Sequence, residues 1–147
     1  MDRVREASLV LGANVDRTHM TNVAHTVIAR QDVGDVDGIV ELFAEDCTFM
    51  MPVLAEPIRG REPLREHVKA WPKAITETEW VAIEGNRLVC AWNWRGATDW
   101  PDDIPLLRGV STFIFDDDGL IQDYEDFFDP DWVTRKSNGL NPLLTQQ

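Results

Sequence analysis

Residues 109–130, GVSTFIFDDDGLIQDYEDFFDP, most constrain the fold of this chain, because they predict two strands joined by a tight turn. Side chains in a strand point alternately to the two faces of a sheet, and both halves of the stretch alternate in this way. The Asp-Asp-Asp-Gly sequence between them is typical of a turn, since Asp tolerates left-handed backbone angles and Gly adopts them without penalty. We therefore predict an antiparallel hairpin with strands over residues 106–116 and 120–128.

An acidic residue in the second predicted strand is the main candidate for catalysis. Tyr124, Asp126 and Phe128 share one face of that strand, and two aromatic residues out of three favour the interior. Burial would raise the pKa of the Asp126 carboxyl toward neutrality, which suits a general acid or base. Two alternatives remain open: Arg95 or Arg108 holds the carboxylate ionised, or it is an ion-paired group at the rim of the sheet.

The rest of the chain predicts helices followed by strands. Helices are expected over residues 18–33, 37–44 and 61–71, a short strand over 47–51, and longer strands over 76–84 and 86–98. Thr18 or Thr21 is the expected N-cap of the first helix. This order predicts a single α+β domain over residues 1–147, with a core over about 18–131, in which helices cover one face of a curved antiparallel sheet.

Composition and charge exclude several classes of function. The 147 residues are 44% hydrophobic, which is typical of a globular protein, and the net charge of −12 makes nucleic acid an unfavourable partner. No apolar run is long enough for a membrane helix, and no signal peptide is recognisable, so a cytoplasmic protein is expected.

The sequence shows no pattern of metal ligands. Cys47 and Cys90 are expected in the core, and the three histidines are dispersed. In the acidic turn, Ile114 stands where a calcium loop needs its first ligand. We therefore expect no metal and no cofactor.

The chain contains six tryptophans, which indicate a pocket for a hydrophobic small molecule because large aromatic side chains often line cavities. The predicted lining comes from the strands and from two helices. The substrate-binding candidates are Val27, Phe49, Met51, Trp71, Trp92, Trp94, Ser111, Phe113, Tyr124 and Phe128.

Two segments carry a resemblance to a known family. The segment GDVDGIVELFAEDCTFMMPVLAEPIRGREPLREHV resembles the N-terminal half of the NTF2-like superfamily, which includes SnoaL-like polyketide cyclases, ketosteroid isomerases and limonene epoxide hydrolases. The hairpin DDDGLIQDYEDFFDP resembles the closing strands of that superfamily. The resemblance covers about residues 21–131 and implies a cone-shaped half-barrel sheet with N-terminal helices packed on its concave face. It implies little about the reaction, because this fold serves many functions.

Most of the catalytic residues of the ketosteroid isomerases have no counterpart in this sequence. Val27 stands where those enzymes have a tyrosine, and Met51 stands where they have the aspartate that acts as base. Ser111 falls at about the position of their second acid. Since neither Val nor Met can transfer a proton, the resemblance disfavours steroid isomerisation by that mechanism.

The epoxide hydrolases match at only one position. Asp126 corresponds to the aspartate of their last strand, and their Arg and first Asp fall near Asn93 and Arg95. Phe49 and Met51 replace the Tyr and Asn that hold the water.

The register of the strand over residues 86–98 decides whether the predicted pocket contains an arginine. A one-residue shift would turn Arg95 outward and Trp92 and Trp94 inward. The apolar alternation of Cys90, Trp92 and Trp94 favours this second register.

The sequence leaves three hypotheses open. The first is a SnoaL-like cyclase, isomerase or dehydratase for a hydrophobic substrate, with Asp126 as acid or base and Arg95 as a second catalytic candidate. The second is epoxide opening. The third is a non-catalytic binding or assembly module, which the apolar residues at Val27 and Met51 support. We also expect a homodimer formed through the outer face of the sheet, which would carry Ala91, Asn93, Val110, Thr112 and Ile114.

Overall fold

The structure is a computed structural model that describes residues 15–97 and 106–132. The helices in this part of the chain are α2 (Arg17–Val33), α3 (Val36–Val40) and α4 (Arg61–Lys69). The strands are β1 (Phe43–Met50), β2 (Ile58–Arg59), β3 (Ala74–Glu84), β4 (Arg87–Gly96), β5 (Leu107–Phe115) and β6 (Ile121–Phe127). The predicted α+β class, with helices before the long strands, is confirmed.

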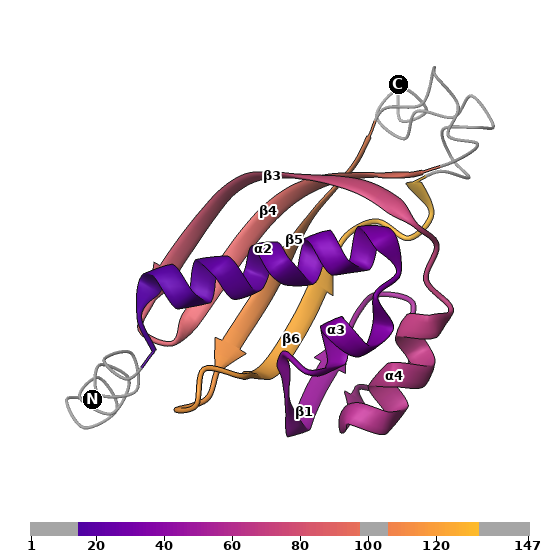
Figure 1. Ribbon diagram of the computed structural model, residues 1–147. Coiled ribbons are helices and arrows are strands. Elements are labelled where there is room, and N and C mark those ends of the chain that lie inside the picture. The colour runs from indigo at the N-terminus through magenta and orange to yellow at the C-terminus, as the bar shows by residue number, and fades with distance from the viewer. Residues whose placement is uncertain (1–14, 98–105, 133–147) are drawn as a thin grey trace.

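The strands form one curved sheet in the order β2-β1-β6-β5-β4-β3, and α2 runs across its concave face (Figure 1). Helices α3 and α4 lie at the β1 side of the sheet. The long strands β3 to β6 form the predicted antiparallel meander. Strand β1, however, pairs parallel to β6, so the sheet is mixed. No local sequence feature predicts this pairing, because it joins strands that α4 and most of the meander separate along the chain.

The ends of several elements differ from the prediction. Helix α2 begins after Asp16, whose carboxylate accepts a hydrogen bond of 2.6 Å from the backbone N–H of His19, so Thr18 and Thr21 are not the cap. The predicted helix over 37–44 ends at Val40, and β1 already begins at Phe43. A short apolar run such as this one fits a helix and a strand equally well. The segment between β1 and α4, for which no element was predicted, contains β2, which pairs with β1.

The register of the meander divides the concave face of the sheet into two ends. At one end, Leu88 on β4 lies opposite Phe113 on β5, and Phe113 lies opposite Tyr124 on β6. Leu88 and Phe113 are fully buried in the core. At the other end, Trp92 lies opposite Gly109, where a Cβ atom would come within 2.3 Å of Cη2 of the indole. Glycine is therefore needed at this position for the Trp92 ring to lie across β5.

The N-cap of α2 provides a test of the helix boundary. We expect Asp16→Ala to lower the free energy of unfolding by about 1 kcal/mol, because an N–H at the start of the helix loses its acceptor. Thr18→Ala is the matched control, since Thr18 lies inside the first turn and alanine is the better helix former there. Urea denaturation of both variants measures the difference. A larger loss for Thr18→Ala than for Asp16→Ala would contradict this boundary.

Candidate active site

The pairing of β5 with β6 places Ser111 directly opposite Asp126. These two side chains are the buried polar residues of the described core, with 1% of Ser111 and 5% of Asp126 exposed. On its other side Ser111 lies opposite Cys90 of β4. The alternation that predicted an inward-facing Asp126 is therefore correct, and the cross-strand neighbour on β5 is a hydroxyl.

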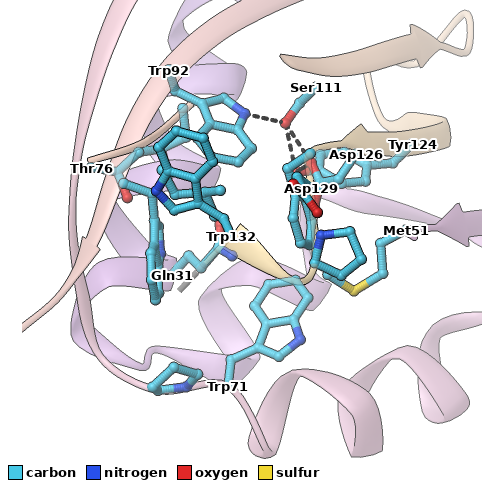
Figure 2. Close-up of a pocket in the computed structure, with 16 residues that line it drawn as sticks. Gln31, Met51, Trp71, Thr76, Trp92, Ser111, Tyr124, Asp126, Asp129 and Trp132 are labelled. Carbon is cyan, nitrogen blue, oxygen red and sulfur yellow. Dashed lines mark hydrogen bonds between the residues drawn. The ribbon is translucent and has the colours of Figure 1, made fainter. Parts of the chain in front are cut away.

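A chain of hydrogen bonds holds the Asp126 carboxyl (Figure 2). The indole N–H of Trp92 donates to Ser111 Oγ at 2.8 Å, and Ser111 Oγ–H donates to Asp126 Oδ1 at 2.5 Å. The phenolic O–H of Tyr124 donates to the same Oδ1 at 2.6 Å. Because an indole N–H can only donate, it occupies a lone pair of Ser111 and leaves the serine proton for the carboxylate.

The two oxygens of the carboxyl group are therefore not equivalent. Both hydroxyl groups donate to Oδ1 of Asp126, and Oδ2 has no hydrogen-bond partner among the residues that the structure describes. In the part of the chain that the structure describes, every fully buried side-chain nitrogen or oxygen has a hydrogen-bond partner. It follows that Oδ2 is the oxygen that reaches the adjacent cavity, and that a proton bound by Asp126 is carried on Oδ2.

The environment of Asp126 sets its acidity. Burial raises the pKa of this carboxyl from 3.8 to about 6, although the hydrogen bonds from Ser111 and Tyr124 favour the ionised form and lower it. Burial, and then the charge of Asp126, raise the pKa of Tyr124 well above its ordinary value, so Tyr124 remains a donor. A carboxyl with a pKa near 6 exchanges its proton readily at neutral pH, as a general acid or base must.

A cavity of about 260 Å³ lies beside the carboxyl, and Figure 2 shows its aromatic walls. The sheet contributes Thr76, Trp92, Trp94, Leu107, Ser111, Tyr124 and Asp126, and the segment after β6 contributes Phe128, Asp129, Pro130 and Trp132. The remaining wall comes from α2 and from the residues after β1 and α4, namely Ile28, Gln31, Met51, Trp71 and Pro72.

Seven of the ten predicted substrate-binding residues line this cavity: Met51, Trp71, Trp92, Trp94, Ser111, Tyr124 and Phe128. The other three, Val27, Phe49 and Phe113, lie in the core instead. The reason is that Tyr124 covers two of them. Its ring stacks on Phe49 and meets Phe113 edge-on, each at 4.9 Å between centroids.

The predicted arginines are not beside Asp126. Strand β4 adopts the register that turns Trp92 and Trp94 inward, and Arg95 does not line the cavity. Arg108 forms an exposed ion pair with Glu79 at 2.9 Å. The prediction that Arg108 pairs with Asp126 is therefore wrong. No contact supports the same pairing for Arg95.

Sequence reasoning missed several residues of the wall. Leu107 could have been found, because it continues the alternation of Ser111 along β5. Ile28 and Gln31 could have been found by helical spacing along α2. Asp129, Pro130 and Trp132 follow the last strand, where no periodicity applies. No group of three His, Cys, Asp or Glu residues suited to a metal ion occurs among residues 15–97 and 106–132.

His67 was not among the predicted pocket residues, but it contacts Trp71, which lines the cavity. Its Nε2 accepts a hydrogen bond of 3.0 Å from the indole N–H of Trp71 one helical turn later. Burial lowers the pKa of His67, which favours the neutral ring that this bond requires. His67 thus fixes the orientation of Trp71 at the edge of the cavity.

Comparison with known proteins identifies the family. The model of the SnoaL-like domain matches residues 24–124, and a steroid Δ-isomerase of Nocardioides simplex is 31% identical over 97 residues, which are 66% of this chain and 79% of that protein. The chain belongs to the SnoaL-like family. The resemblance to this family seen in the sequence is confirmed.

Several solved structures share the fold. The epoxide hydrolase/cyclase-like enzyme SalBIII, which has a role in pyran ring formation in the polyether salinomycin, superposes with a TM-score of 0.67 at 20% identity, over 80% of this chain and 95% of that one. A ketosteroid isomerase-like protein of Kribbella flavida gives 0.60 at 18% identity, over 78% and 81% of the two chains. An NTF2-like protein of Cytophaga hutchinsonii gives 0.61 at 14% identity, over 76% and 90%. The expected cone-like fold is therefore confirmed.

No helix in the described ranges of this SnoaL-like protein is long and apolar enough to cross a membrane.

Cys47 and Cys90 are free and fully buried, so the predicted place of both in the core is confirmed.

The buried carboxyl has a cost in stability that depends on pH. The folded protein binds the Asp126 proton more tightly than the unfolded chain, so ionisation destabilises the fold as pH rises through about 6. The rise in pKa from 3.8 to about 6 corresponds to about 3 kcal/mol. We expect Asp126→Asn to be more stable than the wild type by up to about this amount at pH 8, and by much less at pH 4.

Chemical denaturation of both proteins across this pH range tests the prediction. Glu125→Gln is the control, because Glu125 is the next residue of β6 and points to the opposite face of the sheet. It should retain most of the pH dependence of the wild type, because the charge of Glu125 is the smallest of the effects on the pKa of Asp126. An equal loss of stability in Asp126→Asn at all pH values would contradict the assignment of a raised pKa.

Proposed function

We propose that this SnoaL-like protein is an enzyme that transfers a proton on a hydrophobic small molecule, in an isomerisation, cyclisation or dehydration, with Asp126 as the acid or base. The observation that carries this proposal is the position of one carboxyl group. It is 95% buried, two hydroxyl groups hold Oδ1, and Oδ2 reaches an aromatic cavity. Buried polar atoms are generally hydrogen-bonded within the protein, so a carboxyl oxygen that faces a cavity favours a functional role over a purely structural one.

The chemistry follows from the two protonation states. With a pKa of about 6, Asp126 is mostly ionised at pH 7, and Oδ2 can take a proton from a carbon next to a carbonyl group. The same oxygen then returns the proton at another carbon of the substrate. Ser111 and Tyr124 keep their bonds to Oδ1 throughout, so the reacting oxygen does not rotate out of the cavity. The aromatic walls reduce access of water to the intermediate.

The names of the relatives agree with this class of reaction, since one is a steroid Δ-isomerase and another is an epoxide hydrolase/cyclase-like enzyme. The residues that catalyse in this chain would nevertheless be placed differently. Met51 and Ser111 replace two acidic positions that the ketosteroid isomerase resemblance implies, and Asp126 lies one strand away, opposite Ser111. We infer that this protein keeps the carboxyl chemistry of such enzymes but uses β6 to supply it.

The two alternative hypotheses have less support. Epoxide opening with an arginine would need that side chain at the cavity, and the described lining contains neither Arg nor Asn. A non-catalytic assembly module is less consistent with the cavity of about 260 Å³ between the tryptophans and the carboxyl group. A non-catalytic binding module is compatible with this cavity, and the assay of turnover below distinguishes it from an enzyme.

Removal of the carboxyl group tests the proposal. With a series of cyclic β,γ-unsaturated ketones as probes, we expect Asp126→Asn to lower kcat by at least about 100-fold, because general acid–base catalysis contributes that much. The growth of conjugated-enone absorbance measures isomerisation, and deuterium uptake next to the carbonyl group in D2O detects proton abstraction even without a stable product. For the wild type, kcat should rise with pH through about 6.

Glu125→Gln is again the matched control, because it removes the same charge from the same strand on the opposite face. It should keep the wild-type rate. Turnover that Asp126→Asn leaves unchanged would rule out Asp126 as the acid or base.

We also propose that two copies of the chain associate through the outer face of the sheet. The cross-strand pairs form an apolar row on that face, namely Trp80, Ala91, Val110 and Phe127. Trp80 on β3 is 52% exposed and Phe127 on β6 is 49% exposed, and the small or medium side chains of Ala91 and Val110 connect them across β4 and β5. A two-fold dimer would bury both side chains.

Sedimentation at micromolar concentration tests this association. We expect a species of about twice the 16.8 kDa chain mass, and we expect Trp80→Glu to shift it to the monomer because the charge could not be buried. Val53→Glu is the control, since Val53 is an equally exposed apolar residue in the loop after β1. A wild-type protein that sediments only as a monomer would contradict the proposal.

A further inference from the structure

The charged groups of the cavity are of one sign. Among the described residues that line it, Asp126 and Asp129 are the charged side chains, and none of the lining residues is Lys, Arg or His. The groups that affect the acidity of Asp126 are Ser111, Tyr124 and Glu125, and they include no cation. An ionised Asp126 therefore has hydrogen-bond donors but no counter-charge from the side chains that surround it.

The cationic side chains of the described chain that form ion pairs do so on the surface. Arg108 pairs with Glu79, Arg65 with Asp37 and Glu62, Arg30 with Asp35 and Glu41, and Lys69 with Glu66. None of these pairs includes a residue that lines the cavity. Among residues 15–97 and 106–132, no cationic side chain lines the cavity beside Asp126, so a ligand is a possible source of positive charge there.

The walls of the cavity are aromatic, and aromatic rings attract cations. Tyr124, Phe128 and four tryptophans line the cavity. The tryptophans come from several elements and are Trp71, Trp92, Trp94 and Trp132. Figure 2 shows Trp71 and Trp92 on different sides of the space in front of Asp126. The face of an indole ring is negative, and Trp is the aromatic side chain that attracts ammonium groups most strongly. The net charge of −12 favours the approach of a cation from solution as well.

We propose that the cavity binds a ligand that carries an amine or quaternary ammonium group, with the cation between the tryptophan rings and the Asp126 carboxylate. The alkyl groups of such a cation suit apolar walls, because its charge is spread over several carbon atoms. Anionic ligands, including carboxylates and phosphate esters, are disfavoured by the Asp126 carboxylate. This inference concerns binding alone and does not depend on the proton-transfer role of Asp126.

Three small probes of nearly equal shape and different charge test the proposal with the wild-type protein. They are choline, its neutral isostere neohexyl alcohol, and the anion tert-butylacetate. The titrations are made at about pH 8, where Asp126 is ionised. Changes in the indole N–H signals of the six tryptophans in ¹⁵N-labelled protein report binding, and substitution of Trp92 and Trp94 by Phe, one at a time, assigns their signals.

We expect choline to bind at least about 10-fold more tightly than neohexyl alcohol, with the Trp92 and Trp94 signals among those that move, and tert-butylacetate not to bind. In Asp126→Asn the preference for choline should fall several-fold, while neohexyl alcohol should bind as before. Glu125→Gln, which removes one charge from the opposite face, should keep the preference.

Equal binding of choline and neohexyl alcohol by the wild type would overturn the proposal, and so would choline binding that leaves the Trp92 and Trp94 signals unmoved. A preference for choline that is as large in Asp126→Asn as in the wild type would also overturn it. The result is independent of catalysis: an Asp126→Asn variant that retained turnover would remove the proposed function and leave the charge preference to be decided by these titrations.

Discussion

The hydrogen bond between Ser111 and Asp126 is the interaction on which the candidate site depends. A carboxyl group that is 95% buried needs donors to tolerate ionisation, and the register of β5 against β6 supplies one of them directly opposite. Trp92 fixes the direction of the serine proton, and it can do so only because Gly109 leaves room for its ring. A shift of one residue between β5 and β6 would turn Asp126 away from the cavity and separate all of these groups.

The second donor depends on packing rather than on register alone. Tyr124 lies between Phe49 of β1 and Phe113 of β5, and these rings hold it in the orientation that brings its hydroxyl group to Asp126. The parallel pairing of β1 with β6 places Phe49 opposite Tyr124. The core and the site therefore share one aromatic cluster, and residues that do not touch the cavity still determine the acidity of the carboxyl group.

The concave face of the sheet has a closely packed end and an end that contains the cavity. Leu88, Phe113 and Phe115 form well-packed core at one end, while a cavity and a carboxyl with a raised pKa occupy the other. Burial of such a group lowers stability at neutral pH, and the hydrophobic core offsets this cost. The proposed proton transfer and the proposed cation binding both use this carboxyl group, because both would follow from a negative charge in an aromatic environment.

The sequence by itself determined the periodic features of this protein. Alternation in the last two strands placed Ser111, Tyr124 and Asp126 on one face, and the apolar series in β4 placed Trp92 and Trp94 inside, because side-chain direction in a strand follows directly from position. The SnoaL-like fold was also recognisable, since its turns and helix starts are local signals. What the sequence could not determine was contact between segments far apart along the chain.

Only the tertiary structure decided how these residues meet. It paired β1 with β6 in parallel, moved Val27, Phe49 and Phe113 out of the wall and into the core, and brought Trp132 and Gln31 to the cavity. It also showed that hydroxyl groups, and not Arg95 or Arg108, surround the Asp126 carboxyl. The physical reason is that pairing across a sheet and the packing of rings depend on the whole fold, whereas the alternation of a strand is a property of the strand alone.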